Sequence, residues 1–135
     1  MFHDTEAFSG FSIKNAEEAK RFYGDVLGMD IAGLPGMEEY GMLELHIKNG
    51  HNVLMYEKAD HKPATFTVLS FPVDDIDEAV DALVAKGVEM IQYDWKEMPQ
   101  DKKGIARGLK IGMGPDIAWF ADPSGNNLAV LQPPR

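Results

Sequence analysis

The sequence predicts an α+β fold: two tandem βαβββ modules whose sheets form a cup, with the helices on the outside. The main observation is an internal repeat, because "FSIKNAEEA" from Phe11 lines up with "FPVDDIDEA" from Phe71. A second match, at a slightly larger offset, joins "GHNV" from Gly50 to "GNNL" from Gly125. A repeat of this length in two copies indicates a duplicated domain rather than a solenoid. Each copy reads as a strand, a helix and three further strands, so two copies can set their sheets around a common hollow.

The elements of the first half follow from local patterns. Asn15 with Glu18 three positions later is a capping-box pattern, and Gly28 suits the left-handed position after a helix. We therefore expect a helix from Asn15 to about Leu27. The pair Asn49-Gly50 is a hairpin turn signal between alternating runs. The predicted strands are Ala7–Ile13, Met29–Ala32, Tyr40–Ile47 and Asn52–Glu57.

The second half repeats this order. Asp75 and Glu78 begin the second helix and Gly87 ends it, matching Gly28 after a deletion of one residue. The turn 122–126, "DPSGN", joins two nearly continuous apolar runs and predicts a hairpin covered on both faces. The predicted strands are Thr65–Val73, Glu89–Tyr93, Ile117–Ala121 and Asn127–Leu131. The expected boundaries are 6–58 for the first module, 59–63 for a linker and 64–133 for the second module.

Composition limits the possible functions. The 135 residues carry a net charge of −9 and a pI near 4.8, which argues against nucleic acid or an anionic membrane as a partner. There is no cysteine, so disulfides, thiolate metal sites and a cysteine nucleophile are excluded. No signal peptide or apolar run of membrane-spanning length is visible, and we expect a cytoplasmic protein.

The motifs "IKNAEEAKRFYGDVLGM", "FPVDDIDEAVDALVAKGV" and "WFADPSGNNLAVLQ" resemble the vicinal oxygen chelate superfamily. That group includes glyoxalase I, bleomycin-resistance proteins and extradiol dioxygenases. The resemblance covers nearly the whole chain. It implies paired βαβββ modules around a small ligand, often within a dimer, so we expect a homodimer and a small-molecule partner.

The resemblance also implies a divalent metal held by His, Gln or Glu on the first and fourth strands of each module. The matching positions here are Phe8, Leu54, Val68 and Ala129, and none has a donor atom. A catalytic metal site needs about three protein ligands. We therefore expect a member that lacks the usual metal ligands and has no cofactor, which argues against glyoxalase and dioxygenase activity.

Strand parity predicts the side chains that line the cup. They are mostly aromatic and apolar with a few polar groups, as small-molecule pockets usually are. The predicted ligand-binding residues are Phe8, Ser12, Glu44, His46, Leu54, Tyr56, Phe66, Val68, Trp119 and Ala129.

Some of these residues have two interpretations. His46 and Glu44 are two apart on one strand face and could be an acid–base pair or simply two polar residues on a solvated face. Tyr56 and Trp119 could stack on a flat ligand or fill the cup as core. His51 could join His46 and Glu44 on a metal, but its place at a turn argues against convergence.

The segment from Trp95 to Gly108 is the least patterned and predicts a long loop. Its Lys102, Lys103 and Arg107 form a basic cluster in an acidic protein. They could clamp an anionic ligand or act as a lid, or the loop could be solvated.

Three functions remain open. The first is a metal-independent protein that holds an apolar or aromatic ligand in the cup. The second is a lyase or isomerase-type enzyme of the same superfamily that uses His46 and Glu44 as acid and base. The third is an interaction module whose cup is filled by its own side chains.

Overall fold

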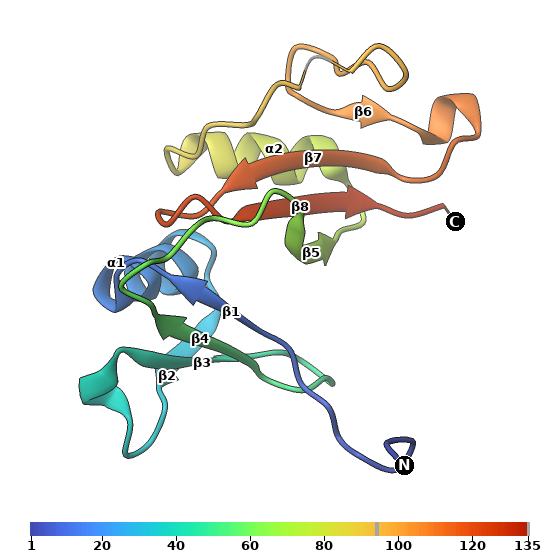
Figure 1. The fold of residues 1–135 in the computed structure, drawn as a ribbon. Coiled ribbons are helices and arrows are strands. Elements are labelled where there is room, and N and C mark those ends of the chain that lie inside the picture. The colour runs from blue at the N-terminus through green and yellow to red at the C-terminus, as the bar shows by residue number, and fades with distance from the viewer. Residues whose placement is uncertain (94, 135) are drawn as a thin grey trace. The chain divides into compact units, whose positions relative to one another are not determined.

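The computed structural model of the chain describes residues 1–93 and 95–134. The chain divides into two compact units, Met1–Pro63 and Ala64–Arg135. Each unit has one four-stranded mixed sheet and a helical segment between its first and later strands, which confirms the predicted α+β class (Figure 1). Among the described residues, no helix has the length and apolarity needed to cross a bilayer.

The first unit has the strand order β1-β4-β3-β2. Strand β1 runs parallel to β4, and the other neighbours are antiparallel. The strands are β1 (Gly10–Ile13), β2 (Asp30–Gly33), β3 (Met42–His46) and β4 (Val53–Glu57). The helical segments are α1 (Ala16–Lys20), the π-helix η1 (Arg21–Val26) and the 3-10 helix η2 (Glu38–Tyr40).

The two faces of the first sheet differ in burial. Phe11, Met55 and Leu43 form one cross-strand row and are buried. The ring of Tyr23 from η1 packs on this face, with its centroid 6.4 Å from that of Phe11. We call the opposite side the helix-free face. Its side chains are partly exposed and include Ser12, Glu44, His46, Leu54 and Tyr56.

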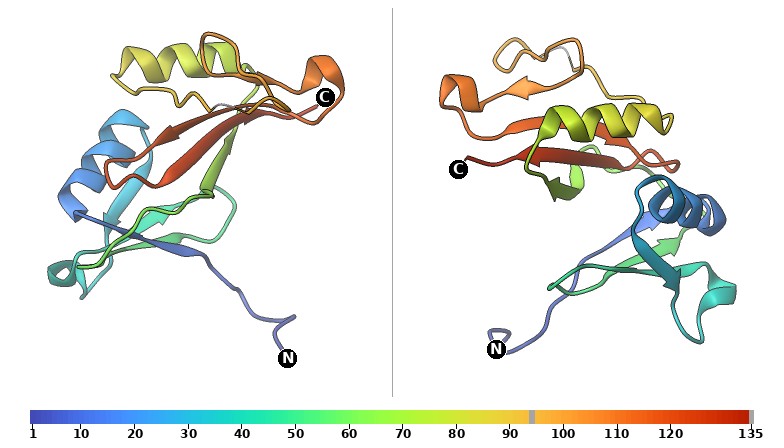
Figure 2. Two further views of the ribbon diagram at one scale, coloured as in Figure 1. Left: turned by 45° about the horizontal axis from the view of Figure 1, so that its top comes forward. Right: turned by 180° about the vertical axis from the view of Figure 1, so that it is seen from behind.

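The second unit has the strand order β5-β8-β7-β6, with β5 parallel to β8. Its strands are β5 (Thr67–Pro72), β6 (Ala106–Arg107), β7 (Asp116–Ala121) and β8 (Asn127–Gln132). Helix α2 (Ile76–Ala85) lies against β7 and β8 (Figure 2), and the 3-10 helix η3 (Leu109–Ile111) precedes β7. Phe120 on β7 and Phe71 on β5 stack on the face that α2 covers, at a centroid distance of 6.4 Å.

The internal repeat extends to the hydrogen bonds that start each helix. The carboxylate of Glu57, at the end of β4, accepts from the backbone N–H of Ala16 at 2.7 Å. In the second unit the amide oxygen of Gln132, at the end of β8, accepts from the N–H of Ile76 at 3.0 Å. Asn15 and Asp75 also cap their helices as predicted, each accepting from the N–H three residues later. The same device therefore anchors each helix to the last strand of its own unit.

Several predicted strands are shorter in the structure, and one is absent. Strand β1 begins at Gly10 rather than Ala7, although the carbonyl of Ser9 still accepts from Leu54 N–H at 3.0 Å. The prediction of a strand over 89–93 is wrong, because only an isolated bridge at Met90 and one bond from Ile91 N–H to Trp119 remain. The N–H of Tyr93 donates to the side-chain oxygen of Gln100 at 2.6 Å rather than to a neighbouring strand, so the chain leaves the sheet there.

The first helix runs to about the predicted end but changes type. After α1 it continues as η1, in which Leu27 N–H reaches the carbonyl of Phe22, five residues back. The first module has one residue more than the second between its helix start and its terminating glycine. A π-turn accommodates such an extra residue without ending the helix.

Candidate functional site

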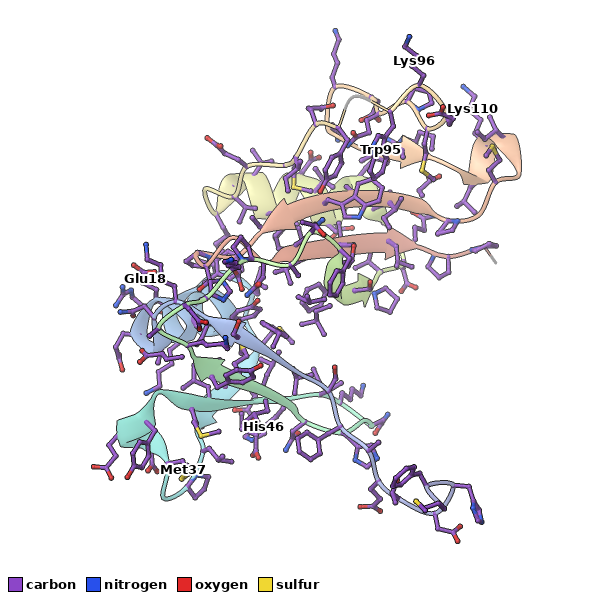
Figure 3. All side chains as sticks on the ribbon, in the orientation of Figure 1. Glu18, Met37, His46, Trp95, Lys96 and Lys110 are labelled. Atoms are coloured by element: carbon purple, nitrogen blue, oxygen red, sulfur yellow. The ribbon has the colours of Figure 1, made fainter. Side chains whose placement is uncertain are left out.

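A histidine lies between two carboxylates on the helix-free face of the first sheet. The antiparallel register of β2 and β3 places Asp30 opposite His46, while Glu44 is two residues before it on the same face. The Nδ1 atom of His46 is 3.0 Å from Asp30 Oδ2, and its Nε2 is 2.9 Å from Glu44 Oε1. Figure 3 labels His46 on this sheet. We call these three side chains the Asp–His–Glu cluster.

The cluster favours a charged imidazole. The hydrogen bond with Asp30, and then that with Glu44, raises the pKa of His46 above its ordinary value of 6.5. A protonated ring can donate from both nitrogens, and each nitrogen has a carboxylate to receive the bond. A general base instead needs an unprotonated nitrogen facing its substrate. The arrangement therefore supports charge pairing more directly than proton abstraction.

A pocket of about 350 Å³ adjoins this cluster within the first unit. Glu44 belongs to both the cluster and the pocket. The wall combines the N-terminal segment, the residue after β2, β3, the turn after β3, and β4. Its residues are Glu6, Phe8, Leu34, Glu44, His51, Asn52 and Leu54. The pocket has both apolar surface and carboxylates, and its size falls in the range of small-molecule sites.

The structure brings three predicted ligand-binding residues, Phe8, Glu44 and Leu54, into that pocket. Ser12 lies elsewhere on the helix-free face, where its hydroxyl is 2.7 Å from His61 Nδ1. His61 is therefore not the simply solvated linker residue that its position suggests. Tyr56 is half-buried and pairs with Ser12 in the register of β1 and β4.

In the second unit, Trp119 and Ala129 lie beneath side chains of the same unit. Both are buried, and Ile91, Tyr93 and Met98 are among the residues packed against them. The indole of Trp95, labelled in Figure 3, stacks on Tyr93 at 4.5 Å and meets Trp119 edge-on at 5.4 Å. These contacts match the interpretation of Trp119 as core more closely than that of an open stacking wall.

The other two predicted residues of this unit, Phe66 and Val68, differ in exposure. Phe66 is 68% exposed just before β5, and Val68 is half-buried where the register of β5 shifts against β8. Their roles as ligand contacts stay predictions.

The prediction of a loop from Trp95 to Gly108 is wrong near its end, because Arg107 belongs to the short strand β6. Two residues of its basic cluster, Lys103 and Arg107, are paired within the second unit. Arg107 makes a bidentate bond to Asp77 on α2, at 2.8 and 2.9 Å, and its Nε donates to Asp101 at 3.1 Å. Lys103 lies 2.9 Å from Asp81, also on α2. Their pairing with carboxylates argues against the anion clamp, although the two side chains remain 40% and 34% exposed. Their charges attach the loop to α2.

The residues present do not fit the divalent metal that the resemblance implies. Phe8, Leu54, Val68 and Ala129 supply no oxygen, nitrogen or sulfur side-chain donor. Within residues 1–93 and 95–134, no group of three or more His, Asp or Glu side chains has a metal-binding arrangement. In the Asp–His–Glu cluster, the two carboxylates bind opposite nitrogens of one ring and do not converge on a point.

Sequence reasoning missed Asp30 and four pocket residues. The missed pocket residues are Glu6, Leu34, His51 and Asn52. Asp30 could have been found by pairing the second predicted strand with the third across the turn at 33–36. Glu6 precedes Phe8 by two positions and shares its parity. Asn52 precedes Leu54 by two positions in the predicted strand Asn52–Glu57 and also shares its parity. Leu34 and His51 lie in connections, which have no periodic signal.

Comparison with known families gives one match. The profile of the Glyoxalase/Bleomycin resistance protein/Dioxygenase superfamily matches residues 10–130. No curated protein sequence matches the chain.

Solved structures with similar folds cover nearly the whole chain. TnmS3, an antibiotic binding protein from Streptomyces sp. CB03234, is 22% identical with a TM-score of 0.66 over 99% of both chains. A glyoxalase/dioxygenase from Nostoc punctiforme is 14% identical with a TM-score of 0.67 over 98% of this chain and 92% of its own. A glyoxalase family protein from Enterococcus faecalis is 20% identical with a TM-score of 0.61 over 98% of this chain and 100% of its own. At these identities the likeness shows the fold alone.

Proposed function

We propose a function from the premise that this chain belongs to the Glyoxalase/Bleomycin resistance protein/Dioxygenase superfamily. In this proposal the protein binds a small molecule without a metal, and the ligand has an apolar or aromatic body. The observation that carries the proposal is the pocket of about 350 Å³ on the helix-free face, bounded by Phe8, Leu34 and Leu54 on its apolar side. Binding in such a pocket removes apolar ligand surface from water.

Two further observations support a binding role. The positions that the resemblance assigns to metal ligands are occupied by Phe8, Leu54, Val68 and Ala129, which favour apolar contact over coordination. TnmS3, which shares the fold at 22% identity, is described as an antibiotic binding protein. A ligand of comparable kind is our expectation for this chain.

The alternative is a lyase or isomerase-type enzyme that uses His46 and Glu44. The 2.9 Å contact between His46 Nε2 and Glu44 Oε1 is the observation that favours it. The second carboxylate, from Asp30, stabilises the proton on the ring and argues for binding instead. The cytoplasmic location and the homodimer stay predictions.

Thermal-shift screening tests the proposal, using aromatic antibiotics, thiol conjugates and divalent metals as separate sets. A ligand that binds only the native state raises the melting temperature by mass action. We expect organic ligands to raise it and the shift to fall in Leu54→Asn, which places an uncharged polar group on the apolar wall. Stoichiometric Zn, Ni, Mn or Fe in the purified protein would overturn metal independence. Turnover of a metabolite that is lost in His46→Ala would favour the enzyme.

A further inference from the structure

The composition of the pocket in the first unit points to the charge of its ligand. Two carboxylates, from Glu6 and Glu44, face a space whose other walls are Phe8, Leu34 and Leu54, with His51 and Asn52 at the turn. No lysine or arginine is among the described residues that line it. A carboxylate beside an aromatic ring and aliphatic side chains is a typical environment for an ammonium group on an apolar body.

Glu44 connects this pocket to His46. Its Oε1 receives the bond from His46 Nε2, while the side chain as a whole is 30% exposed and reaches the pocket. A ligand cation beside Glu44 would therefore lie near the protonated imidazole. Two positive charges sharing one carboxylate repel each other, so the cation makes the protonated ring less favourable.

We propose that the pocket binds an organic cation, a protonated amine on an apolar or aromatic body, and that its binding releases the proton of His46. This inference rests on the proposed binding function and names its ligand class. Glu44 and Glu6 contact the ammonium group, and Phe8 and Leu54 contact the apolar body. Asp30 remains bonded to Nδ1 and keeps the ring in place on the sheet.

The sign of the pH dependence follows from the groups around His46. Asp30 faces it from β2 and Glu44 from β3, and both favour the charged ring in the free protein. The pocket residue Leu54 on β4 is uncharged, and the turn before β4 adds His51 as a titratable group of the same wall. Since the bound cation opposes the proton on His46, proton release accompanies binding. Affinity for the amine rises as pH rises through the pKa of His46.

Phenethylamine and 2-phenylethanol are matched probes, because they share a ring and chain length and differ in charge. Their binding is followed by chemical-shift titration of the full chain from about pH 6 to about pH 9, because the pKa of His46 is raised above its ordinary value. We expect the amine to bind about tenfold more tightly than the alcohol at the higher pH, the ratio typical of one charge-assisted hydrogen bond. The shifted signals should include Leu54 and Asn52.

Variants separate the two parts of the inference. Glu44→Gln and Glu6→Gln should each reduce the preference for the amine, while Glu39→Gln, an exposed acid outside the pocket, should leave it unchanged. Glu6→Gln is the safer of the two for folding, since Glu6 lies in the exposed N-terminal segment. His46→Gln should keep the preference but remove most of the pH dependence.

Each part can be overturned on its own. Equal affinity for the alcohol and the amine overturns the cation preference. The pocket would then be a binding site without a preference for charge. Amine affinity that does not change with pH, or that changes equally in His46→Gln, overturns the proton coupling. If neither probe shifts the pocket signals, the inference fails, and the thermal-shift screen with aromatic antibiotics and thiol conjugates still decides whether the pocket binds other ligands.

Discussion

Replacing Arg107 by methionine should destabilise the second unit through charge rather than volume. The guanidinium binds both carboxylate oxygens of Asp77, reaches Asp101 and lies 3.6 Å from the buried carboxylate of Asp116. Methionine keeps part of the aliphatic length but supplies no donor. The variant therefore leaves three carboxylates near one another with their main cation removed.

The magnitude follows from the pKa of Asp77. The hydrogen bonds from Arg107 are the main cause that lowers it from 3.8 to about 2, with a smaller contribution from Lys103. A shift of that size corresponds to about 2.4 kcal/mol of stability. The side chain of Asp77 is 45% exposed, so solvent screening reduces the contribution to roughly 1 kcal/mol. Asp116 keeps its hydrogen bond from the Leu109 N–H, and the loss of its 3.6 Å ion pair with Arg107 adds roughly 1 kcal/mol more.

Urea unfolding followed by tryptophan fluorescence measures this cost, because Trp95 and Trp119 both report on the second unit. We expect a loss of about 2 kcal/mol at neutral pH. Since the pKa of Asp77 is lowered on folding, its contribution is present above about pH 4 and is lost as pH falls through about 2. Lys110→Met, at an exposed position of η3, is the control and should leave the midpoint unchanged. A cost below about 0.5 kcal/mol at neutral pH, or an equal cost at pH 2, would refute the charge account.

Three further predictions concern other contacts. Asp30→Asn should lower the pKa of His46 more than Glu44→Gln does, because the hydrogen bond to Asp30 is the larger cause of the raised pKa. NMR titration of the imidazole ring measures both changes, and the reverse order would contradict this reasoning. Glu57→Ala should lower the free energy of unfolding by about 1 kcal/mol, since it leaves the Ala16 N–H without its acceptor, and unchanged exchange of that amide would show that the bond is unimportant. Trp95→Ala should expose Trp119 and shift the remaining fluorescence to the red, with a stability loss of about 1 kcal/mol from the lost aromatic contacts; an unshifted spectrum would mean that Trp95 does not cover it.

The helix of the first module has one residue more than that of the second, and the sequence predicted only part of what this does to the structure. Matching Gly28 to Gly87 required one extra residue in the first module, and the structure places it in η1 as π-turns. The alignment indicated that a residue was inserted. It did not indicate whether the helix would shorten, bulge or change type, because those outcomes depend on how Tyr23 packs against the sheet.

The candidate site shows the same division. Strand parity placed Glu44, His46 and Leu54 on one face, and the register of β3 and β4 agrees. Parity along one strand says nothing about the strand beside it. The bond between His46 Nδ1 and the carboxylate of Asp30 therefore depends on the antiparallel register of β2 and β3. The pocket joins Glu44 and Leu54 of the predicted face to connections with no periodic pattern.

By itself, the sequence determined the α+β class, the duplicated order of strands and helices apart from the place of β6, both helix caps and the absence of donors at the implied metal positions. These depend on local patterns and residue chemistry, which a single chain displays directly. The tertiary structure alone decided that Tyr93 and Trp95 cover Trp119, that Arg107 joins the long loop to α2, and that two carboxylates flank His46. Each of these contacts brings together residues from different segments, and only the packing of the folded chain selects one such partner among many.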